Sequence, residues 1–323
     1  MNTANKMKPG IKEKLTHRTV RRKIFIACVL TPILAWFVVF MFLPIINVFY
    51  LSLTNARMAF PTHEFIGLDN YIRMLTRDSI IPVAVWNTVQ AVFIIVPSVL
   101  VLALLLAAAL NSIGDRSRKA FTFIYFLPSV IPMVAISLVW DWLYHPQFGL
   151  FNAILTSIGF TPQHFLRSSA QALPSISVVV IWSLFGYYAV ILLAAMRNIS
   201  PSLYEAADID GASPVAKFFK IVLPLIKPNI LFVTIMSTIA SFMLFTPVDV
   251  LTGGRGTPGT STLVLMLYIR NVGITDGNTG YASAISILLL AIVLAVSLVQ
   301  WLLRGESEPK VKRKAKKGGV VHG

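Results

Sequence analysis

The sequence predicts an all-α integral membrane protein with six transmembrane helices, and two observations carry this prediction. Of the 323 residues, 56% are hydrophobic and only 13% are charged, whereas about a quarter of the residues of a soluble domain are charged. Six intervals contain no Asp, Glu, Lys or Arg, and each has at least the roughly 20 residues that a spanning helix needs. Because lipid offers the backbone no hydrogen-bond partner, these intervals must form helices rather than loops.

The six intervals follow one another along the chain and leave no loop long enough for a separate soluble domain. The first is too long for the roughly 7 to 15 apolar residues of a signal peptide, so we expect a retained span. In chain order they are Ile24–Ala56, Ser79–Gly114, Ala120–Trp140, Ser168–Met196, Pro228–Val248 and Gly277–Leu303. We therefore expect a basic tail over 1–23, a six-helix domain over 24–303, and a basic, disordered tail over 304–323.

The distribution of basic residues predicts the orientation in the membrane. The two tails and the loops 115–119 and 197–227 together hold 22 of the 28 Lys and Arg residues. Loops rich in these residues stay on the cytoplasmic side, so we expect both termini and both loops in the cytoplasm. The net charge of +15 comes from these flanks, which predicts contact with anionic lipid rather than with nucleic acid.

The sequence carries no pattern that indicates catalysis. The single cysteine, Cys28, allows neither an internal disulfide nor a cysteine metal cluster, and the five histidines lack ligand spacing. No P-loop is present, and the G-x-G-x-x-G at 254–259 follows no strand and is interrupted by Pro258. Because the spans carry no charge, we expect no ion relay, and energy for any transport would come from another protein.

A polar segment, residues 200–224, interrupts the apolar chain before the fifth interval. Ser200-Pro201 predicts a helix start, because proline is tolerated in the first turn. Ser202 and Glu205 fit a capping box, in which each side chain bonds the other's backbone N–H. Gly211 predicts the end of this helix, since glycine readily adopts the left-handed conformation that follows a helix.

Ser213-Pro214 predicts a second helix in the same segment by the same reasoning. Its apolar residues recur at helical spacing and share one face, whereas Lys217 and Lys220 point away from that face. The apolar residues are Val215, Phe218, Phe219 and Val222. This pattern is typical of a helix that lies on a membrane surface.

Seven residues of the segment keep the spacing E-A-A-x3-G-x9-I-x-L-P: Glu205, Ala206, Ala207, Gly211, Ile221, Leu223 and Pro224. This spacing resembles the EAA signature of ABC-importer permeases, and the form EAADIDGAS resembles their sugar-permease branch. The stretches 65–71, 251–254 and 280–284 resemble the same branch, whereas 255–258 departs from it. The resemblance covers the chain from about residue 24 to 303.

The resemblance implies a type I ABC importer permease fold and a multi-pass protein of a prokaryotic inner membrane. It also implies a second permease subunit in a heterodimer, two ATPase subunits that hold ATP and magnesium, and an extracytoplasmic sugar-binding protein. This chain would then be no enzyme and would hold no cofactor or metal. In its coupling loop, Glu205 would pair with a basic group of the ATPase, Ala206 and Ala207 would permit close packing, and Gly211, preceded by Asp210, would set the angle between the helices.

The resemblance also implies a substrate path beside the loop. Tyr187 and Tyr188 on the fourth span and Ser241 on the fifth lie where maltose-type permeases contact substrate. Asn87 and Gln90 on the second span are further polar candidates, since a sugar path needs polar groups and aromatic faces. Each of these side chains could instead form hydrogen bonds between helices.

Three alternatives remain at the level of the sequence. The same machinery could carry glycerol phosphate or another small solute, although spans without Lys or Arg favour a neutral sugar. A channel or carrier that works without ATP would leave the EAA spacing unexplained. A membrane scaffold would depend on the basic tails, so deletion of Lys310–Gly323 would abolish its function but would change importer activity little.

Overall fold

The computed structural model describes residues 9–60 and 62–303, and over these ranges the chain is helical apart from turns and two isolated β-bridges. The predicted disordered tail, 304–323, lies outside the described residues. The chain divides into two compact units. Of the described residues, the smaller unit comprises 9–60, 62–78 and 269–287, and the larger comprises 79–268 and 288–303.

Five helices in the described ranges are long and apolar enough to cross a membrane, and counting one bent helix pair as a single crossing gives six. Each candidate span overlaps one charge-free interval of the sequence, so the predicted all-helical class is confirmed. The spans are Arg21–Ser52, Ile80–Ser112, Asp115–Val130 with Met133–Leu143, Ala172–Arg197, Lys227–Thr252 and Thr279–Leu302.

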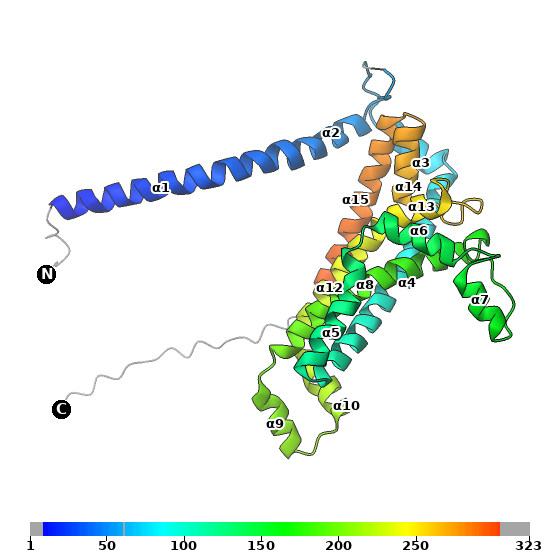
Figure 1. The fold of residues 1–323 in the computed structure, drawn as a ribbon. Helices are drawn as coiled ribbons and strands as arrows, with labels where there is room; N and C mark the ends of the chain where they lie inside the picture. The colour runs from blue at the N-terminus through cyan, green and yellow to red at the C-terminus, as the bar shows by residue number, and fades with distance from the viewer. Residues whose placement is uncertain (1–8, 61, 304–323) are drawn as a thin grey trace, which may run out of the picture. The chain divides into compact units, whose positions relative to one another are not determined.

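The first span belongs to the smaller unit and is continuous. It is formed by α1 (Pro9–Phe37), the π-helical turn η1 (Val38–Phe42) and α2 (Leu43–Ser52), which Figure 1 shows as one long rod. None of its most apolar window is buried within the chain. A helix that is hydrophobic all round needs lipid or another protein around it.

The third span is broken, and this corrects the prediction of one helix over Ala120–Trp140. It consists of α5 (Asp115–Phe126), the 3₁₀ turn η2 (Leu127–Val130) and α6 (Met133–Leu143), with a bend of 96° between the two halves. The break falls at Ile131, whose ψ of 134° is extended. Pro132 explains this conformation, because proline disfavours the helical conformation of the residue before it.

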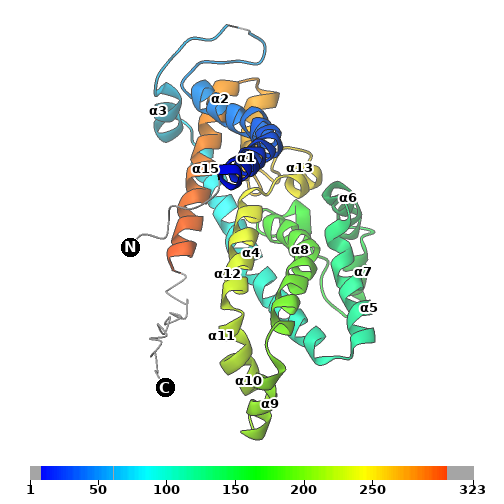
Figure 2. The same cartoon turned by 90° about the vertical axis from the view of Figure 1, so that its left-hand side faces the viewer.

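The centre of the larger unit is the contact between α4 (Ile80–Ser112) and α8 (Ala172–Arg197), with α12 (Lys227–Phe242) packed against α4 (Figure 2). Four alanines of α4 have no exposed surface, and small residues let membrane helices approach closely. They are Ala84, Ala91, Ala103 and Ala107. Outside the segment 200–225, the other elements of the two units are α3 (Asp69–Thr76), α7 (Leu150–Ser157), η3 (Phe165–Arg167), α13 (Thr246–Thr252), α14 (Leu265–Arg270), η5 (Asn271–Thr275) and α15 (Thr279–Leu302).

Gly186 lies where α8 meets the end of α5. A Cβ at this position would lie 1.8 Å from the backbone carbonyl oxygen of Tyr125. The two backbones are therefore in direct contact, and only a residue without a side chain fits between them.

In the smaller unit, the predicted stretch 65–71 closes the end of α2. Asn70 donates hydrogen bonds from Nδ2 to the backbone oxygens of Ser52 (2.8 Å) and Thr54 (2.9 Å). The Tyr71 hydroxyl donates to Ser52 Oγ over 2.8 Å. The two Asn70 bonds satisfy carbonyl oxygens that the end of a helix leaves without intrahelical partners.

The stretch 280–284 reaches the same place from the other end of the chain. The Gly280 N–H donates to the Ala56 oxygen over 2.9 Å, and a Cβ on Gly280 would lie 2.3 Å from the Thr54 oxygen. Tyr281 donates its hydroxyl to Asp78 over 2.6 Å, and the Arg73 guanidinium lies 4.2 Å from the ring centroid. The stretches 65–71 and 280–284, both of which resemble the sugar-permease branch, thus meet at the end of α2.

We predict that Gly186→Ala destabilises the protein by about 2 kcal/mol or more, because overpacking against a backbone atom outweighs the better helix propensity of alanine. Thermal unfolding of the detergent-solubilised chain, followed by tryptophan fluorescence, measures this. Gly114→Ala is the matched control, since nothing lies within 4 Å of its added Cβ, and should cost no more than about 1 kcal/mol. Equal melting temperatures for the two variants would contradict the close contact.

Candidate functional site

The polar segment between α8 and α12 folds into two short helices joined by a tight turn. The first is α9 (Pro201–Ile209), and the second runs through α10 (Pro214–Lys217), the π turn η4 (Phe218–Val222) and α11 (Leu223–Leu225). Both predicted helix starts are confirmed. Ser213 caps α10 by accepting a 3.2 Å hydrogen bond on Oγ from the Ala216 N–H.

The predicted capping box between Ser202 and Glu205 is wrong. Ser200 is the N-cap of α9, and its side chain caps no backbone N–H of the helix. Because α9 already begins at Pro201, Ser202 lies inside its first turn, and its Oγ instead bonds the Ser200 Oγ over 2.8 Å. The box needs its serine at the N-cap position itself.

The turn after α9 has the geometry of a Schellman motif. Gly211 has a φ of +69° and donates its N–H to the Asp208 oxygen over 3.1 Å, while the Ala212 N–H bonds the Ala207 oxygen over 2.9 Å. Nothing lies within 4 Å of a Cβ built on Gly211. Glycine is therefore favoured here by the backbone conformation and not by lack of space, as the sequence predicted.

An ion pair joins the two helices across this turn. The Lys217 ammonium binds the Asp208 carboxylate, and only 17% of the Lys217 side chain is exposed. The expectation that Lys217 points away from the apolar face is wrong, because its side chain lines the same cavity as Val215 and Phe219. Lys220 is exposed, as expected.

The apolar residues of the second helix lie together, because Val215, Phe218, Phe219 and Val222 all line one cavity. Val222 is buried and Phe218 is half-buried, but Val215 and Phe219 are exposed. A π turn contains one more residue than an α-turn. Despite this extra residue the four apolar side chains stay along the same cavity. The exposure of Val215 and Phe219 does not contradict a membrane-surface helix, whose apolar face meets lipid rather than protein.

The first helix has one anchored face and one free face. Ala207 is buried, and Tyr204 packs against the hydrophobic core. Burial raises the pKa of Tyr204, so its phenol stays protonated. Glu205, Ala206 and Ile209 are exposed, and Ile209 retains 87% of its accessible surface.

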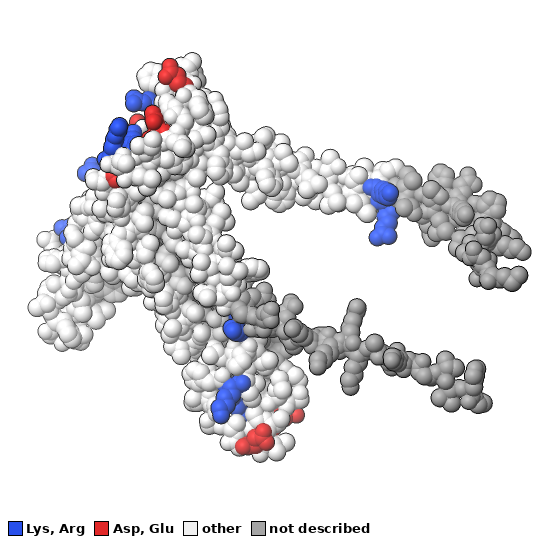
Figure 3. Space-filling model, turned by 180° about the vertical axis from the view of Figure 1, so that it is seen from behind, with Lys and Arg blue, Asp and Glu red and all other residues white. Residues whose placement is uncertain are grey.

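Two further predicted residues of the loop, Asp210 and Gly211, are also exposed. Figure 3 shows basic and acidic side chains together at the lower end of the molecule, where α9 and α10 lie in Figure 1. With Ile209 and Glu205 exposed, the free face of α9 combines an apolar and an acidic group. Such a face suits docking into a groove with a basic edge.

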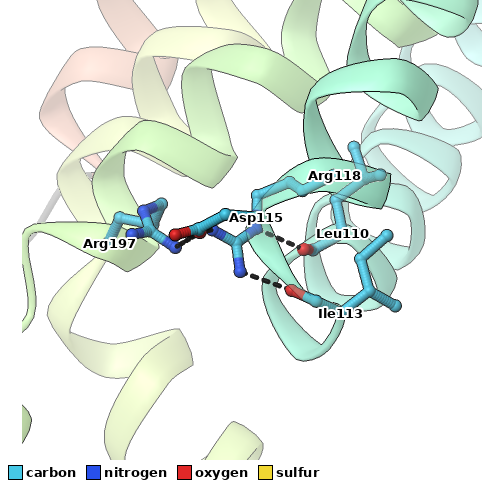
Figure 4. Close-up of polar contacts among 5 residues, drawn as sticks. All are labelled: Leu110, Ile113, Asp115, Arg118 and Arg197. Atoms are coloured by element: carbon cyan, nitrogen blue, oxygen red, sulfur yellow. Dashed lines mark hydrogen bonds and ion pairs between the residues drawn. The ribbon is translucent and has the colours of Figure 1, made fainter.

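A second polar cluster, not anticipated from the sequence, lies beside the loop (Figure 4). Arg118 donates from Nε to the Leu110 oxygen over 2.8 Å and also bonds the Ile113 oxygen, which caps the end of α4. Asp115 pairs with Arg118 and, over 3.8 Å, with Arg197 at the end of α8. The cluster ties α4, α5 and α8 together just before the loop begins. The spacing of Asp115 and Arg118 by three residues was the available signal.

The predicted path residues on α4 differ in their surroundings. Asn87 is buried and donates from Nδ2 to the backbone oxygens of Thr260 (2.7 Å) and Leu263 (3.0 Å), so both its N–H groups are taken. Gln90 lines a cavity of about 450 Å³ together with Trp86. The lining of this cavity contains none of the other four predicted path residues.

The remaining path residues lie on α8 and α12. Tyr187 is 42% exposed, whereas Tyr188 is buried, and their ring centroids are 5.2 Å apart. Ser241 is buried and donates from Oγ to the Ser237 oxygen over 2.7 Å, one turn earlier in its own helix. Of these three side chains, only Tyr187 offers substantial free surface to a ligand.

Within the described ranges, no group of three His, Cys, Asp or Glu residues could hold a metal ion. Cys28 is a free, exposed thiol.

Comparison with known proteins finds components of membrane transport systems. Residues 99–307 match the family model described as binding-protein-dependent transport system inner membrane component. The chain is 35% identical over 251 residues to a sulfoquinovosyl glycerol transport system permease protein of Agrobacterium fabrum, covering 78% of this chain and 79% of that protein. It is 32% identical over 311 residues to a diacetylchitobiose uptake system permease protein of Streptomyces coelicolor, covering 92% and 88%.

A solved structure supports the same fold. The chain is similar, with a TM-score of 0.74 and 25% identity, to a chain of a bacterial ABC transporter involved in the import of the acidic polysaccharide alginate. The similarity covers 90% of this chain and 98% of the other.

We predict that Gly211→Ala weakens the α9 turn by about 1 kcal/mol, because a left-handed alanine costs about 1 to 2 kcal/mol and gains part of this back from a stiffer unfolded chain. Amide hydrogen exchange over residues 203–212 should then be about fivefold faster. Gly211→Asn is the control and should show a smaller change, since asparagine tolerates this conformation better. Equal exchange in alanine, asparagine and glycine forms would show that the turn does not limit α9.

Proposed function

We propose a sugar or oligosaccharide as the substrate of this chain, which belongs to the family of binding-protein-dependent transport system inner membrane components and is the permease subunit of an ABC importer. An extracytoplasmic binding protein delivers the substrate, and ATPase subunits supply the energy. The names of several relatives support a sugar, among them permease proteins for trehalose/maltose in Thermococcus litoralis and for lactose in Rhizobium radiobacter.

The observation that carries the coupling part of the proposal is the two-faced helix α9. Its buried face, with Tyr204 and Ala207, holds it to the bundle, while Glu205 and Ile209 face outward. An ATPase subunit would receive the outward face in a groove, with Ile209 as the apolar contact and Glu205 against a basic group. ATP and magnesium would be held by that partner and not by this chain.

Movement of α9 would reach the spans through two connections. The Schellman turn at Gly211 and the Asp208–Lys217 pair link α9 to α10, which continues through η4 and α11 into α12. The second connection is at the start of α9, which follows α8 in the chain. There the Asp115–Arg197 pair links the end of α8 to the start of α5. Closure of the ATPase subunits would thus move several spans together, which is the requirement for alternating access.

The substrate path would run past Tyr187, whose exposed ring suits stacking against a sugar. Asn87 and Ser241 would position neighbouring backbone rather than bind substrate, because their N–H and O–H groups are already committed. Glycerol phosphate is the second candidate. A neutral sugar is favoured because the six charge-free intervals offer no Lys or Arg to an anion.

The exposed first span supports a pore built from two permease subunits. An apolar helix with no buried window needs lipid and a partner chain around it. We propose a heterodimer with two ATPase subunits in the inner membrane of a prokaryote, with both termini cytoplasmic.

Purification of the tagged chain from its host in mild detergent, followed by mass spectrometry, tests this assembly. A P-loop ATPase and a second permease should accompany the chain. A chain that is purified alone and transports without ATP would refute the proposal.

We predict that Glu205→Arg abolishes uptake and reduces the co-purified ATPase by at least about tenfold, because a like charge replaces the partner of a basic group. The measurements are uptake of radiolabelled sugar and the ATPase-to-permease ratio after purification. Glu64→Arg is the matched control, since Glu64 is also exposed but lies outside the loop. Undiminished uptake by Glu205→Arg would refute the proposed role of Glu205 in coupling to the ATPase.

We predict that Tyr187→Ala raises the KM for sugar uptake by about three- to tenfold, which corresponds to losing one aromatic contact of about 0.5 to 1.5 kcal/mol. Tyr187→Phe keeps the ring and should stay within about twofold of the original value. Unchanged KM in Tyr187→Ala would exclude this side chain from the substrate path.

A further inference from the structure

A cavity of about 490 Å³ lies under the coupling loop. Its walls come from the last turns of α4, the end of α8, helix α9, and the stretch from α10 to η4, all in the larger unit. This volume falls in the range of small-molecule sites, about 300 to 1,000 Å³. Neither the substrate path nor the docking face of α9 uses it.

The rim of the cavity is apolar and exposed. Leu105 is 62% exposed, Val215 66% and Phe219 60%, and all three line the cavity. Leu105 lies within the candidate span Ile80–Ser112, where an exposed apolar side chain suits contact with the hydrocarbon of a membrane. Large apolar side chains grouped around an opening indicate an apolar occupant.

The other end of the cavity offers hydrogen-bond donors. The Tyr204 hydroxyl is buried without a hydrogen bond of acceptable geometry, and Asn111 is the polar side chain beside it. Lys217 also lines the cavity, and its ammonium pairs with the Asp208 carboxylate. Because an ammonium has three N–H donors, it can bind a further acceptor. A phenol, an amide and an ammonium together favour a ligand head rich in acceptor oxygens.

We propose that the cavity binds a phospholipid of the adjacent leaflet, with an acyl chain past Leu105 and Ala108 and the phosphate near Tyr204 and Lys217. The location fits, because α4 and α8 end here and headgroups lie at the level where spans end. The charge fits as well, because the cavity lining contains no Asp or Glu, and the Asp208 side chain that pairs with Lys217 is 66% exposed. A lipid in this position packs between α4 and the two helices of the coupling loop.

The test uses the complex as purified, reconstituted in phosphatidylcholine vesicles that contain a phosphatidylglycerol with a photoreactive acyl chain. After illumination, mass spectrometry should find label in residues 105–112 and 196–222. Ala108→Phe fills the cavity and should reduce this label by about fivefold or more, as expected for loss of a bound chain. Ala109→Phe is the matched control, because Ala109 is exposed on the same turn but does not line the cavity, and should keep the label.

A second variant and a competitor complete the test. Tyr204→Phe removes only the hydroxyl and should lower the label without changing the fold, so the proposal stays testable if Ala108→Phe does not assemble. Inorganic phosphate should not displace the lipid, and displacement by phosphate alone would identify a free anion site instead. Equal labelling of the Ala108→Phe and Ala109→Phe forms would overturn the proposal. Because labelling needs neither sugar nor ATP, its outcome is independent of the proposed transport function.

Discussion

The structure depends on one constraint, which is that backbone polar groups inside a membrane must find partners within the protein. Polar side chains in the spans follow the same rule. Ser137, Ser177, Thr238 and Ser241 each donate their hydroxyl to the carbonyl oxygen four residues earlier in the same helix. Such residues add hydrogen-bonding capacity without leaving an unsatisfied group. They explain how a path that contains polar side chains can be built from helices that still suit lipid.

Where a helix ends or breaks, the same constraint decides which residues are nearby. Arg118 bonds two carbonyl oxygens at the end of α4, and Asn70 bonds two carbonyl oxygens at the end of α2. In both places a side chain replaces the next turn of helix. The first arrangement also recruits Asp115 and, through it, Arg197. A local need of the backbone has thus assembled a charged cluster beside the loop that holds α9 and α10.

The sequence was sufficient for features governed by local rules. Spans follow from length and absence of charge, and the helix starts at Ser200 and Ser213 and the turn at Gly211 follow from short-range chemistry. Features that depend on tertiary packing were missed. The break at Ile131 has a local signal in Pro132, but its angle of 96° depends on how both flanking helices pack. The Lys217 pairing needs the geometry of the Gly211 turn. The π turn η4 carries no known short motif, so the sequence predicted an ordinary α-helix where the chain forms a π turn.

If the loop of α9 and α10 couples to an ATPase as proposed, its exposed ion pairs matter for movement rather than for stability. Exposed pairs such as Asp115 with Arg197 contribute little to stability, typically about 0 to 1 kcal/mol, because water screens them. A strong, buried pair would hold the ends of α5 and α8 in one arrangement, whereas a weak pair lets them separate at small cost and meet again. The rigid part of the connection is the backbone turn at Gly211, and the Asp208–Lys217 pair, with its ammonium largely covered, reinforces it. A loop that is stiff between its two helices and loosely tied to the neighbouring spans can transmit a displacement without fixing the bundle in one state.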